Sequence, residues 1–161
     1  MGNKICSFFG HREVVDKENV YNQVLKLVEN LIVNEDFSIF LFGGYGEFDD
    51  LCRQCVSKLK EQYTDIEIVY CYSDEKQFFR DKRNGTIKNS DYDRFEFLSL
   101  DFNYWYTRIY YRNCEMVNKS HFVIFYAQNK KGSGAYKIYE YAIKTKKSVK
   151  NIFMEQAYNN R

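Results

Sequence analysis

The sequence contains no proline, which argues against a proline-rich linker or a disordered tail. No apolar run approaches the ~18 residues that a membrane-spanning helix requires. A signal-peptide apolar region is also missing. We therefore expect a cytoplasmic protein that has no membrane partner.

Neither sign of charge is in clear excess. Lys and Arg number 24 and Asp and Glu 22, which leaves a formal net charge of +2. Strong non-specific binding to nucleic acid requires a pronounced positive excess, so the composition disfavours nucleic acid as a partner. A solvated helix face accounts for the lysines near the C-terminal end. These are Lys130, Lys131, Lys137, Lys144, Lys146, Lys147 and Lys150.

Several catalytic and metal-binding motifs are missing as well. The glycine-rich segment 130–135 ends in alanine where a Walker motif has lysine, which disfavours classical nucleoside-triphosphate hydrolysis. No G-x-S-x-G nucleophile elbow occurs. Cys52 and Cys55 form a C-x-x-C within a helical apolar stripe, so core packing explains them better than redox chemistry, and no second pair completes a zinc site. We expect no metal and no cofactor.

What the chain does contain is a regular alternation of two apolar patterns. Short continuous apolar runs read as buried strands, at 5–9, 37–42, 66–72, 95–100, 122–127 and 148–153. Apolar residues that recur every three or four positions predict helices at 19–34, 47–62, 104–119 and 136–146. The polar residues 73–93 read as an insertion or a long loop.

This alternation predicts a mainly parallel sheet with helices on both faces. Right-handed crossovers then give a doubly wound, three-layer α/β fold. We expect residues 1–161 to form a single domain with a variable insertion around 73–103.

Ligands of such sheets bind at the carboxyl ends of the strands. Gly10, His11 and Arg12 follow the first strand, and residues 43–49 and 130–136 follow two others. The last two segments are glycine-rich and precede helices, so backbone N–H groups could approach an anion there. The same glycines also suit a tight strand-to-helix turn, so each segment alone has two explanations.

Charged side chains in these segments have two explanations too. Glu47, Asp49 and Asp50 fall in the first turn of a helix, where acids stabilise the helix dipole. Alternatively one of them, Asp49 first, accepts a hydrogen bond from a ribose hydroxyl or acts as a general base. Arg112 with Asn113 either pairs locally or faces a ligand cleft.

Three stretches carry a resemblance to a known family: CSFFGHREV (6–14), FGGYGEFDDLC (42–52) and RNCEMVNKSHFVIFYAQNKKGSGAYKIYEYAIKTKKSVKNI (112–152). Together they resemble the SLOG superfamily. These are Rossmann-like domains related to the lysine-decarboxylase-like LOG phosphoribohydrolases and to the DNA-processing protein of natural transformation. The likeness is to the small, single-domain bacterial members in particular, whose function is unassigned.

The resemblance implies a Rossmann-like sheet with a pocket for a nucleotide or a nucleotide derivative. It implies that the first wall of the pocket consists of Gly10, His11 and Arg12. The implied phosphate- or ribose-facing loop comprises Gly43, Gly44, Tyr45, Gly46 and Asp49. An Arg-Asn pair and a small-residue loop of the family match Arg112, Asn113, Gly132, Ser133, Gly134 and Ala135.

The chain also departs from the family pattern. The phosphoribohydrolases carry P-G-G-x-G-T-x-x-E, in which Phe42, Glu47 and Asp50 here replace proline, threonine and glutamate. We therefore expect a binding or sensing domain for a nucleotide-like small molecule. The alternative is a hydrolase that cleaves a nucleotide N-glycosidic bond, with Asp49 or Glu47 as the catalytic carboxylate. A nucleic-acid-binding module is the third hypothesis.

The helix around 104–111 (YWYTRIYY) has more apolar bulk than one covered face needs. An apolar surplus of this kind is typical of an interaction surface. It suggests a homodimer, although the insertion packing over the helix would cover it equally well.

Overall fold

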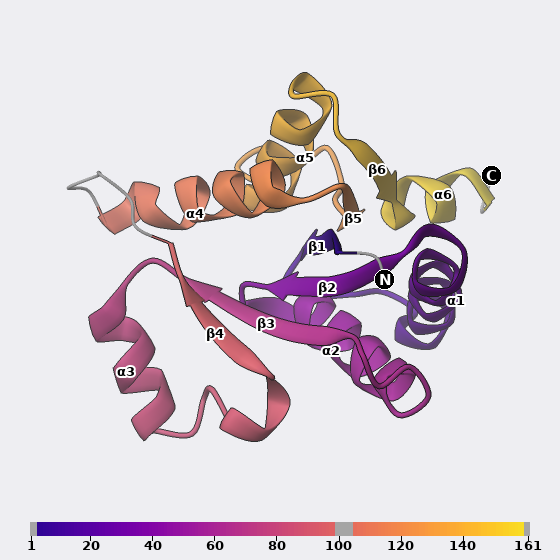
Figure 1. Ribbon diagram of the computed structural model, residues 1–161. Helices are drawn as coiled ribbons and strands as arrows, with labels where there is room; N and C mark the ends of the chain where they lie inside the picture. Colours follow the sequence, from indigo (N-terminus) through magenta and orange to yellow (C-terminus); the bar gives the residue numbers. More distant parts are fainter. Residues whose placement is uncertain (1–2, 99–104, 160–161) are drawn as a thin grey trace.

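The computed structural model describes residues 3–98 and 105–159, and its centre is one six-stranded sheet (Figure 1). The strands are β1 (Lys4–Gly10), β2 (Phe37–Phe42), β3 (Glu67–Tyr72), β4 (Arg94–Phe97), β5 (Phe122–Tyr126) and β6 (Ser148–Asn151). Their order is β4-β3-β2-β1-β5-β6, and every neighbouring pair is parallel. The chain thus adds strands in one direction up to β4 and then returns to the other side of β1.

Helices cover both faces of this sheet (Figure 1). They are α1 (Lys17–Glu35), α2 (Gly46–Lys60), α3 (Glu75–Arg83), α4 (Trp105–Lys119), α5 (Gly134–Lys144) and α6 (Ile152–Asn159), with a short 3-10 turn at Asn89–Asp91. The prediction of a doubly wound, three-layer α/β fold is confirmed. None of the helices within the described residues is long and apolar enough to cross a membrane.

The strands are apolar along their length because both of their faces are buried. Consecutive residues of a strand point to opposite faces. Phe8 accordingly packs into the core beneath α1 and α2, and Phe9 into the core beneath α4 and α5. Val20, Val24 and Val28 of α1 line the first core at helical spacing, fully buried.

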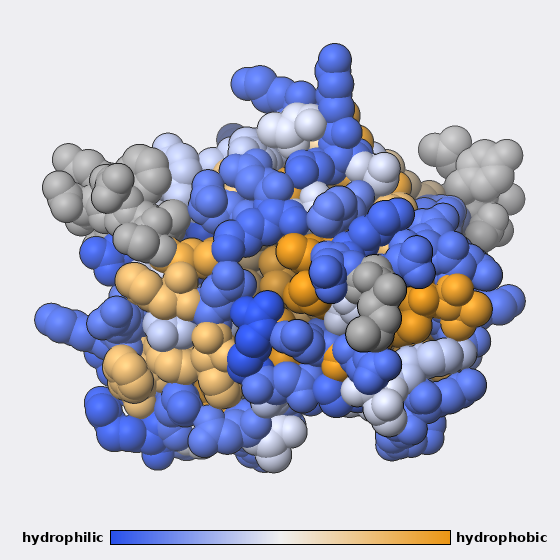
Figure 2. Space-filling model, viewed as in Figure 1, coloured by the Kyte–Doolittle hydropathy of each residue, from blue (hydrophilic) through white to orange (hydrophobic). Residues whose placement is uncertain are grey.

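The segment 73–93, expected as an insertion or a long loop, is partly helical. Asp74 caps α3 by accepting a hydrogen bond from the Gln77 N–H at 3.1 Å. Phe78 stacks on Tyr72 of β3, with the ring centroids 3.8 Å apart. Only this one side chain of α3 is buried, so no helical apolar period exists in the sequence. Figure 2 shows apolar surface over α3 and β4, where Phe79 and Phe97 are exposed.

The C-terminal end also differs from the prediction. The last strand, expected to continue to residue 153, ends at Asn151, and α6 begins at Ile152. The Asn151 side chain accepts a hydrogen bond from the Ala127 N–H at 3.1 Å and donates one to the Ala127 carbonyl at 2.8 Å. Beyond β5, the Ala127 backbone is therefore hydrogen-bonded by the Asn151 side chain, where the prediction had the strand continue.

Two expectations extend beyond the described residues. The strand expected at 95–100 is seen as β4, while positions 99 and 100 lie outside the described part. The helix expected from 104 is α4, and position 104 likewise lies outside. Ile109 and Tyr110 of α4 are exposed, and the homodimer stays a prediction.

Candidate functional site

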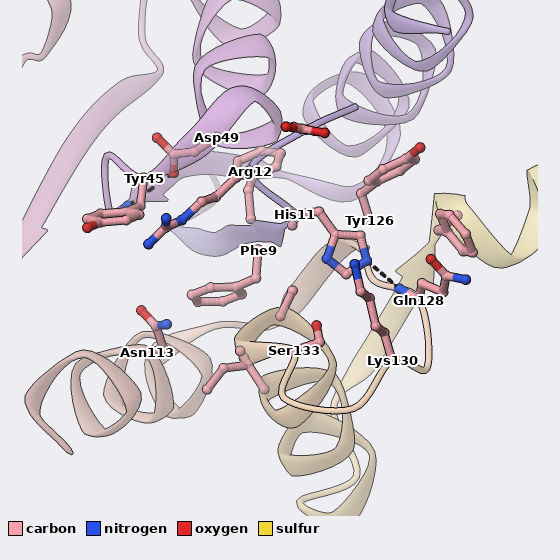
Figure 3. A pocket seen from close by; sticks show the side chains of 18 of the residues that line it. Phe9, His11, Arg12, Tyr45, Asp49, Asn113, Tyr126, Gln128, Lys130 and Ser133 are labelled. Atoms are coloured by element: carbon pink, nitrogen blue, oxygen red, sulfur yellow. Dashed lines mark hydrogen bonds between the residues drawn. The ribbon is translucent and has the colours of Figure 1, made fainter. Parts of the chain in front are cut away.

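A cavity of about 830 Å³ opens at the carboxyl ends of β1 and β5 (Figure 3). This is the point where the strand order changes direction, and open α/β sheets bind ligands in such crevices. The turns after β1, β2 and β5 reach it from the sheet, and α4, α5 and α6 contribute further walls.

Most of the side chains expected at the site do line this cavity. They are Gly10, His11, Arg12, Gly43, Tyr45, Asp49, Arg112, Asn113, Gly132, Ser133 and Gly134. Gly44, Gly46 and Glu47 are not among the lining residues. Most of the residues expected together thus line one cavity, and two of the three exceptions belong to the loop expected to face the phosphate.

In and just after residues 43–46, hereafter the first glycine turn, three backbone N–H groups already have hydrogen-bond acceptors within the protein. The Gly43 N–H donates to Asp49 Oδ1 at 3.3 Å, and the Gly44 N–H also bonds this carboxylate. The N–H of Glu47 donates to the carbonyl of Arg12 at 2.9 Å. These three N–H groups are therefore already occupied and not free to bind an anion.

The glycines of this turn have packing reasons instead. A Cβ on Gly44 would lie 2.3 Å from Cε2 of Tyr70, and one on Gly46 would lie 2.9 Å from Cα of Arg12. Both residues also have positive φ, at 74° and 92°, where side chains other than glycine's are strained. The turn thus lets the β1 and β2 loops approach backbone to backbone.

Glu47 binds the start of α1 rather than the cavity. Its Oε2 accepts a hydrogen bond from the Val14 N–H at 2.7 Å, and its Oε1 pairs with Lys17 Nζ at 2.9 Å. These contacts, Lys17 first, lower the pKa of Glu47. Both carboxylate oxygens are used in holding the β1–α1 loop, and the structure does not bring Glu47 to the position that a catalytic carboxylate would need.

Asp49 lies on the inner wall, with only 6% of its surface exposed. Burial raises the pKa of Asp49 to about 7, although its bonds to the first glycine turn and the charge of Arg112 act in the opposite direction. Arg112 is buried too and donates from Nη1 to the Gly43 carbonyl at 3.3 Å. Its Nη2 donates to Asn113 Oδ1 at 3.0 Å. Asp49 and Arg112 thus form a polar floor around Gly43.

His11 ties the turn after β1 to the turn after β5. Its Nε2 accepts a hydrogen bond from the Gln128 N–H at 2.7 Å. Burial lowers the pKa of His11, and the nearby charge of Lys130 lowers it further. A neutral imidazole whose Nε2 accepts carries its proton on Nδ1, and this nitrogen is directed toward the cavity (Figure 3).

Residues 130–134, hereafter the second glycine turn, are more open than the first. Ser133 caps α5 by accepting a hydrogen bond from the Tyr136 N–H at 3.1 Å. A Cβ on Gly132 or Gly134 would meet no atom within 4 Å. The backbone of this turn faces free space along the cavity, so a ligand can approach it closely.

Three cations of the cavity form no ion pair with a carboxylate among the described residues. Arg12, Lys130 and Lys131 line it, and they join none of the ion pairs between the residues that the structure describes. The Arg12 guanidinium lies over the Tyr45 ring, 5.3 Å from its centroid. Positive charge and an exposed aromatic ring therefore share the cavity rim, alongside one exposed acid, Glu13.

Sequence reasoning missed several lining residues. Lys130 and Lys131 were assigned to a solvated helix face, but they precede α5 and line the cavity. Their position within the second glycine turn, after a strand and before a helix, was the available signal. Tyr126 and Phe153 also form part of the wall, and only the packing of α6 against β5 brings Phe153 there.

The cysteines lie away from this chemistry. All five are buried and free of disulfides, and Cys52 and Cys55 pack in the core beneath α2, as predicted. Within residues 3–98 and 105–159, no three His, Cys, Asp or Glu side chains gather as a metal ion would require.

No protein-family model matches the sequence, and no match was found among curated proteins. Among solved structures, the chain is similar to DNA processing protein A from Helicobacter pylori, a structure described for its single-stranded DNA binding mode. The TM-score is 0.53 at 14% sequence identity. The match covers 91% of this chain and 63% of the other, so this chain spans less than two thirds of that protein. At this identity the likeness shows the fold alone.

This comparison corrects the expectation that nucleic acid is a disfavoured partner. That expectation rested on the net charge of +2, and it is wrong because a protein with the same fold is described as binding single-stranded DNA. The physical reason is that the local field at a site attracts a phosphate backbone, whatever the total charge. Here the unpaired cations gather at one edge of the sheet.

Proposed function

We propose that this chain is a SLOG-type binding domain that holds a nucleotide unit in the cavity at the carboxyl edge of its sheet. One observation carries the proposal: Arg12, Lys130 and Lys131, which join no ion pair among the described residues, line the same cavity as the exposed ring of Tyr45. The resemblance of three sequence stretches to the SLOG superfamily supports it.

The chemistry of the walls suits each part of a nucleotide. Phosphate oxygens favour Lys and Arg side chains that have no competing carboxylate. A base favours an aromatic face, and a guanidinium plane adds to the stacking. The volume of about 830 Å³ lies within the range of small-molecule sites, roughly 300–1,000 Å³.

A nucleotide unit has two sources, a free nucleotide or a single nucleic-acid strand. Free nucleotides need only the cavity itself. A strand also needs cations beyond the cavity. Lys137 and Lys144 of α5 line a smaller hollow of about 300 Å³, together with Tyr110, Tyr141 and one acid, Glu140. The two sources share the same chemistry at the cavity, and one experiment separates them.

The experiment measures binding of the purified protein to two sets of ligands. Thermal-shift assays use nucleoside mono-, di- and triphosphates, and fluorescence anisotropy uses labelled single-stranded and duplex DNA and RNA. If the site binds free nucleotides, a nucleotide raises the melting temperature, and added oligonucleotide reduces this shift only weakly. A single-strand site prefers the strand, with an affinity that falls steeply with salt. If neither set binds, the proposal fails.

A second candidate function rests on Asp49, a cavity-lining carboxyl group whose pKa burial raises to about 7. Hydrolysis of an N-glycosidic bond passes through an oxocarbenium-like transition state, which a carboxylate near the sugar stabilises. In this reading water adds to the anomeric carbon, and the base leaves with the bonding electron pair and takes up a proton.

Chromatography after incubation with each nucleotide tests this candidate. Hydrolysis releases free base and ribose phosphate, and Asp49→Asn then removes turnover while leaving nucleotide binding in place. Recovery of intact nucleotide from a protein that binds it rejects hydrolysis and leaves the binding function standing.

A further inference from the structure

The cavity has two chemically different ends (Figure 3). At one end lie Arg12 and Tyr45, which belong to the turns after β1 and β2. At the other end lie Lys130 and His11, with the second glycine turn below them. Phe9 lies between the two ends, and Asn113 lies on α4 across from Arg12 and Tyr45. A ligand with one aromatic and one anionic end can therefore bind in only one favourable direction.

The first glycine turn is a poor phosphate site. Its Gly43 and Gly44 N–H groups already bond to Asp49, whose buried carboxyl group lies directly behind the turn. A phosphate at this turn would have to displace those hydrogen bonds, and whenever Asp49 is ionised it would also meet a like charge. Each of these effects costs affinity.

The opposite end offers unused positive charge. Lys130 lies close enough to His11 to lower the pKa of the imidazole, and Lys131, the next residue in the chain, also lines the cavity. His11 presents Nδ1, the protonated nitrogen of its neutral ring, toward the cavity. Gly132 and Gly134 leave open space beside these donors, so an anion can come close to all of them.

The Arg12–Tyr45 end offers a flat surface. Tyr45 is 56% exposed although it lines the cavity. It lies between Gly44 and Gly46, whose positive φ values shape the turn that presents the ring. The Arg12 guanidinium already lies over the ring, at 5.3 Å from the centroid. An exposed aromatic ring beside a guanidinium is typical of base stacking.

We propose that the nucleotide unit lies across the cavity with its phosphate at Lys130, Lys131 and His11 and its base against Tyr45 and Arg12. This orientation rests on the proposed function. It assigns the phosphate to the second glycine turn, whereas the family resemblance implied the first. Asp49 and Arg112, which both bond to Gly43, then lie behind the turn that carries Tyr45, at the base end of the ligand.

The test separates the two ends of the ligand. The nucleoside 5′-monophosphate that binds most tightly is compared with its nucleoside and with ribose 5-phosphate by isothermal titration calorimetry. Lys130→Ala/Lys131→Ala weakens the nucleotide and ribose 5-phosphate at least tenfold and leaves nucleoside affinity unchanged. Tyr45→Ala weakens the nucleotide and the nucleoside at least tenfold and leaves ribose 5-phosphate unchanged.

Matched controls exclude general effects. Tyr45→Phe keeps the ring and so retains affinity for all three ligands. Lys26→Ala/Lys76→Ala removes the same amount of charge from exposed positions on α1 and α3 and leaves affinity unchanged. Unfolding curves of each variant without ligand confirm that the fold is intact.

The orientation is overturned if the double-lysine variant weakens the nucleoside, or if Tyr45→Ala weakens ribose 5-phosphate. If the wild-type protein binds only a single strand, an abasic strand replaces ribose 5-phosphate and the same pattern is expected. Failure of the wild-type protein to bind any of these ligands rejects the proposed function itself, which is a different result from a reversed pattern among the variants.

Discussion

The two glycine turns lie on the same cavity, and each leads into a helix, but their glycines meet different surroundings. In the first turn, added Cβ atoms would collide with Tyr70 and with the backbone of Arg12. In the second, Cβ atoms on Gly132 and Gly134 would meet nothing within 4 Å. Close packing therefore requires glycine in the first turn but not in the second, where the positive φ of Gly132, 81°, is the reason for glycine at that position.

The backbone donors differ in the same way. Asp49 accepts hydrogen bonds from the first turn, whereas Ser133 caps α5 from within the second turn. A motif of glycines after a strand is thus not evidence of a phosphate site until the destinations of its N–H groups are known. Substitutions in the two turns test this contrast.

The largest effect is expected for Gly44→Val. The new Cβ would overlap Tyr70 at 2.3 Å, and a β-branched residue would have to adopt a φ of 74°. Together these should cost about 4 kcal/mol or more of folding free energy, a large share of the roughly 5–15 kcal/mol that stabilises a typical domain. Circular dichroism and urea unfolding measure this. A variant as stable as the wild type would contradict the packing role of the first turn.

The next prediction concerns how the free energy of unfolding depends on pH through Asp49, whose carboxyl group accepts hydrogen bonds from the first turn. Its pKa is raised from 3.8 to about 7 in the folded protein, so the folded state holds this proton to a higher pH than the unfolded chain does. The stability that it contributes is complete below about pH 4 and is lost as pH rises toward 7.

Urea unfolding of the wild type and of Asp49→Asn across this range is the measurement. Asn cannot titrate, so the wild-type free energy of unfolding should fall relative to the variant by about 1.4 kcal/mol per pH unit. Two parallel curves would show that Asp49 titrates alike in both states.

A smaller effect is expected for Arg12→Ala, which leaves the backbone of the first turn in place. Arg12 is exposed and contacts Tyr45 through its guanidinium, so the free energy of unfolding should change by less than about 0.5 kcal/mol. Nucleotide affinity should fall roughly tenfold, as expected for a charged group that binds the ligand. Arg83→Ala on α3 is the matched control and should change neither quantity.

No loss of stability is expected for Gly134→Ala. This position begins α5 and has room for a Cβ, and alanine favours the helix over glycine by up to about 1 kcal/mol. The melting temperature should therefore stay level or rise slightly, while the methyl group narrows the cavity and weakens the nucleotide. A loss of stability comparable to that of Gly44→Val would remove the distinction between the turns.

The local pattern of apolar residues in the sequence was sufficient to predict most of the fold. The runs 37–42 and 122–127 predicted β2 and β5 nearly to the residue, because continuous apolar character signals a strand buried on both faces. It was insufficient for α3, which buries only Phe78 and depends on stacking against Tyr72. The same holds for the end of β6, where the Asn151 side chain bonds to Ala127.

The gathering of the candidate residues at one edge of the sheet was predictable from the sequence, but the contacts of each side chain were not. Residues at the carboxyl ends of parallel strands meet at one edge, so His11, Tyr45 and Ser133 were expected together and do line one cavity. Glu47 could not be separated from Asp49 by sequence, since both lie in the first turn of α2. The structure directs Glu47 to Val14 and Lys17 instead.

The sequence by itself determined the alternation of strands and helices, and hence the sheet edge at which a ligand can bind, because periodicity depends on neighbours a few positions away. The tertiary structure alone decided which glycine turn is open. Tyr70 comes from β3 and Arg112 from α4, and the latter contacts Gly43 across 69 positions of sequence. Close packing of such distant residues fills the space around the first turn, and nothing comparable fills the space beside the second.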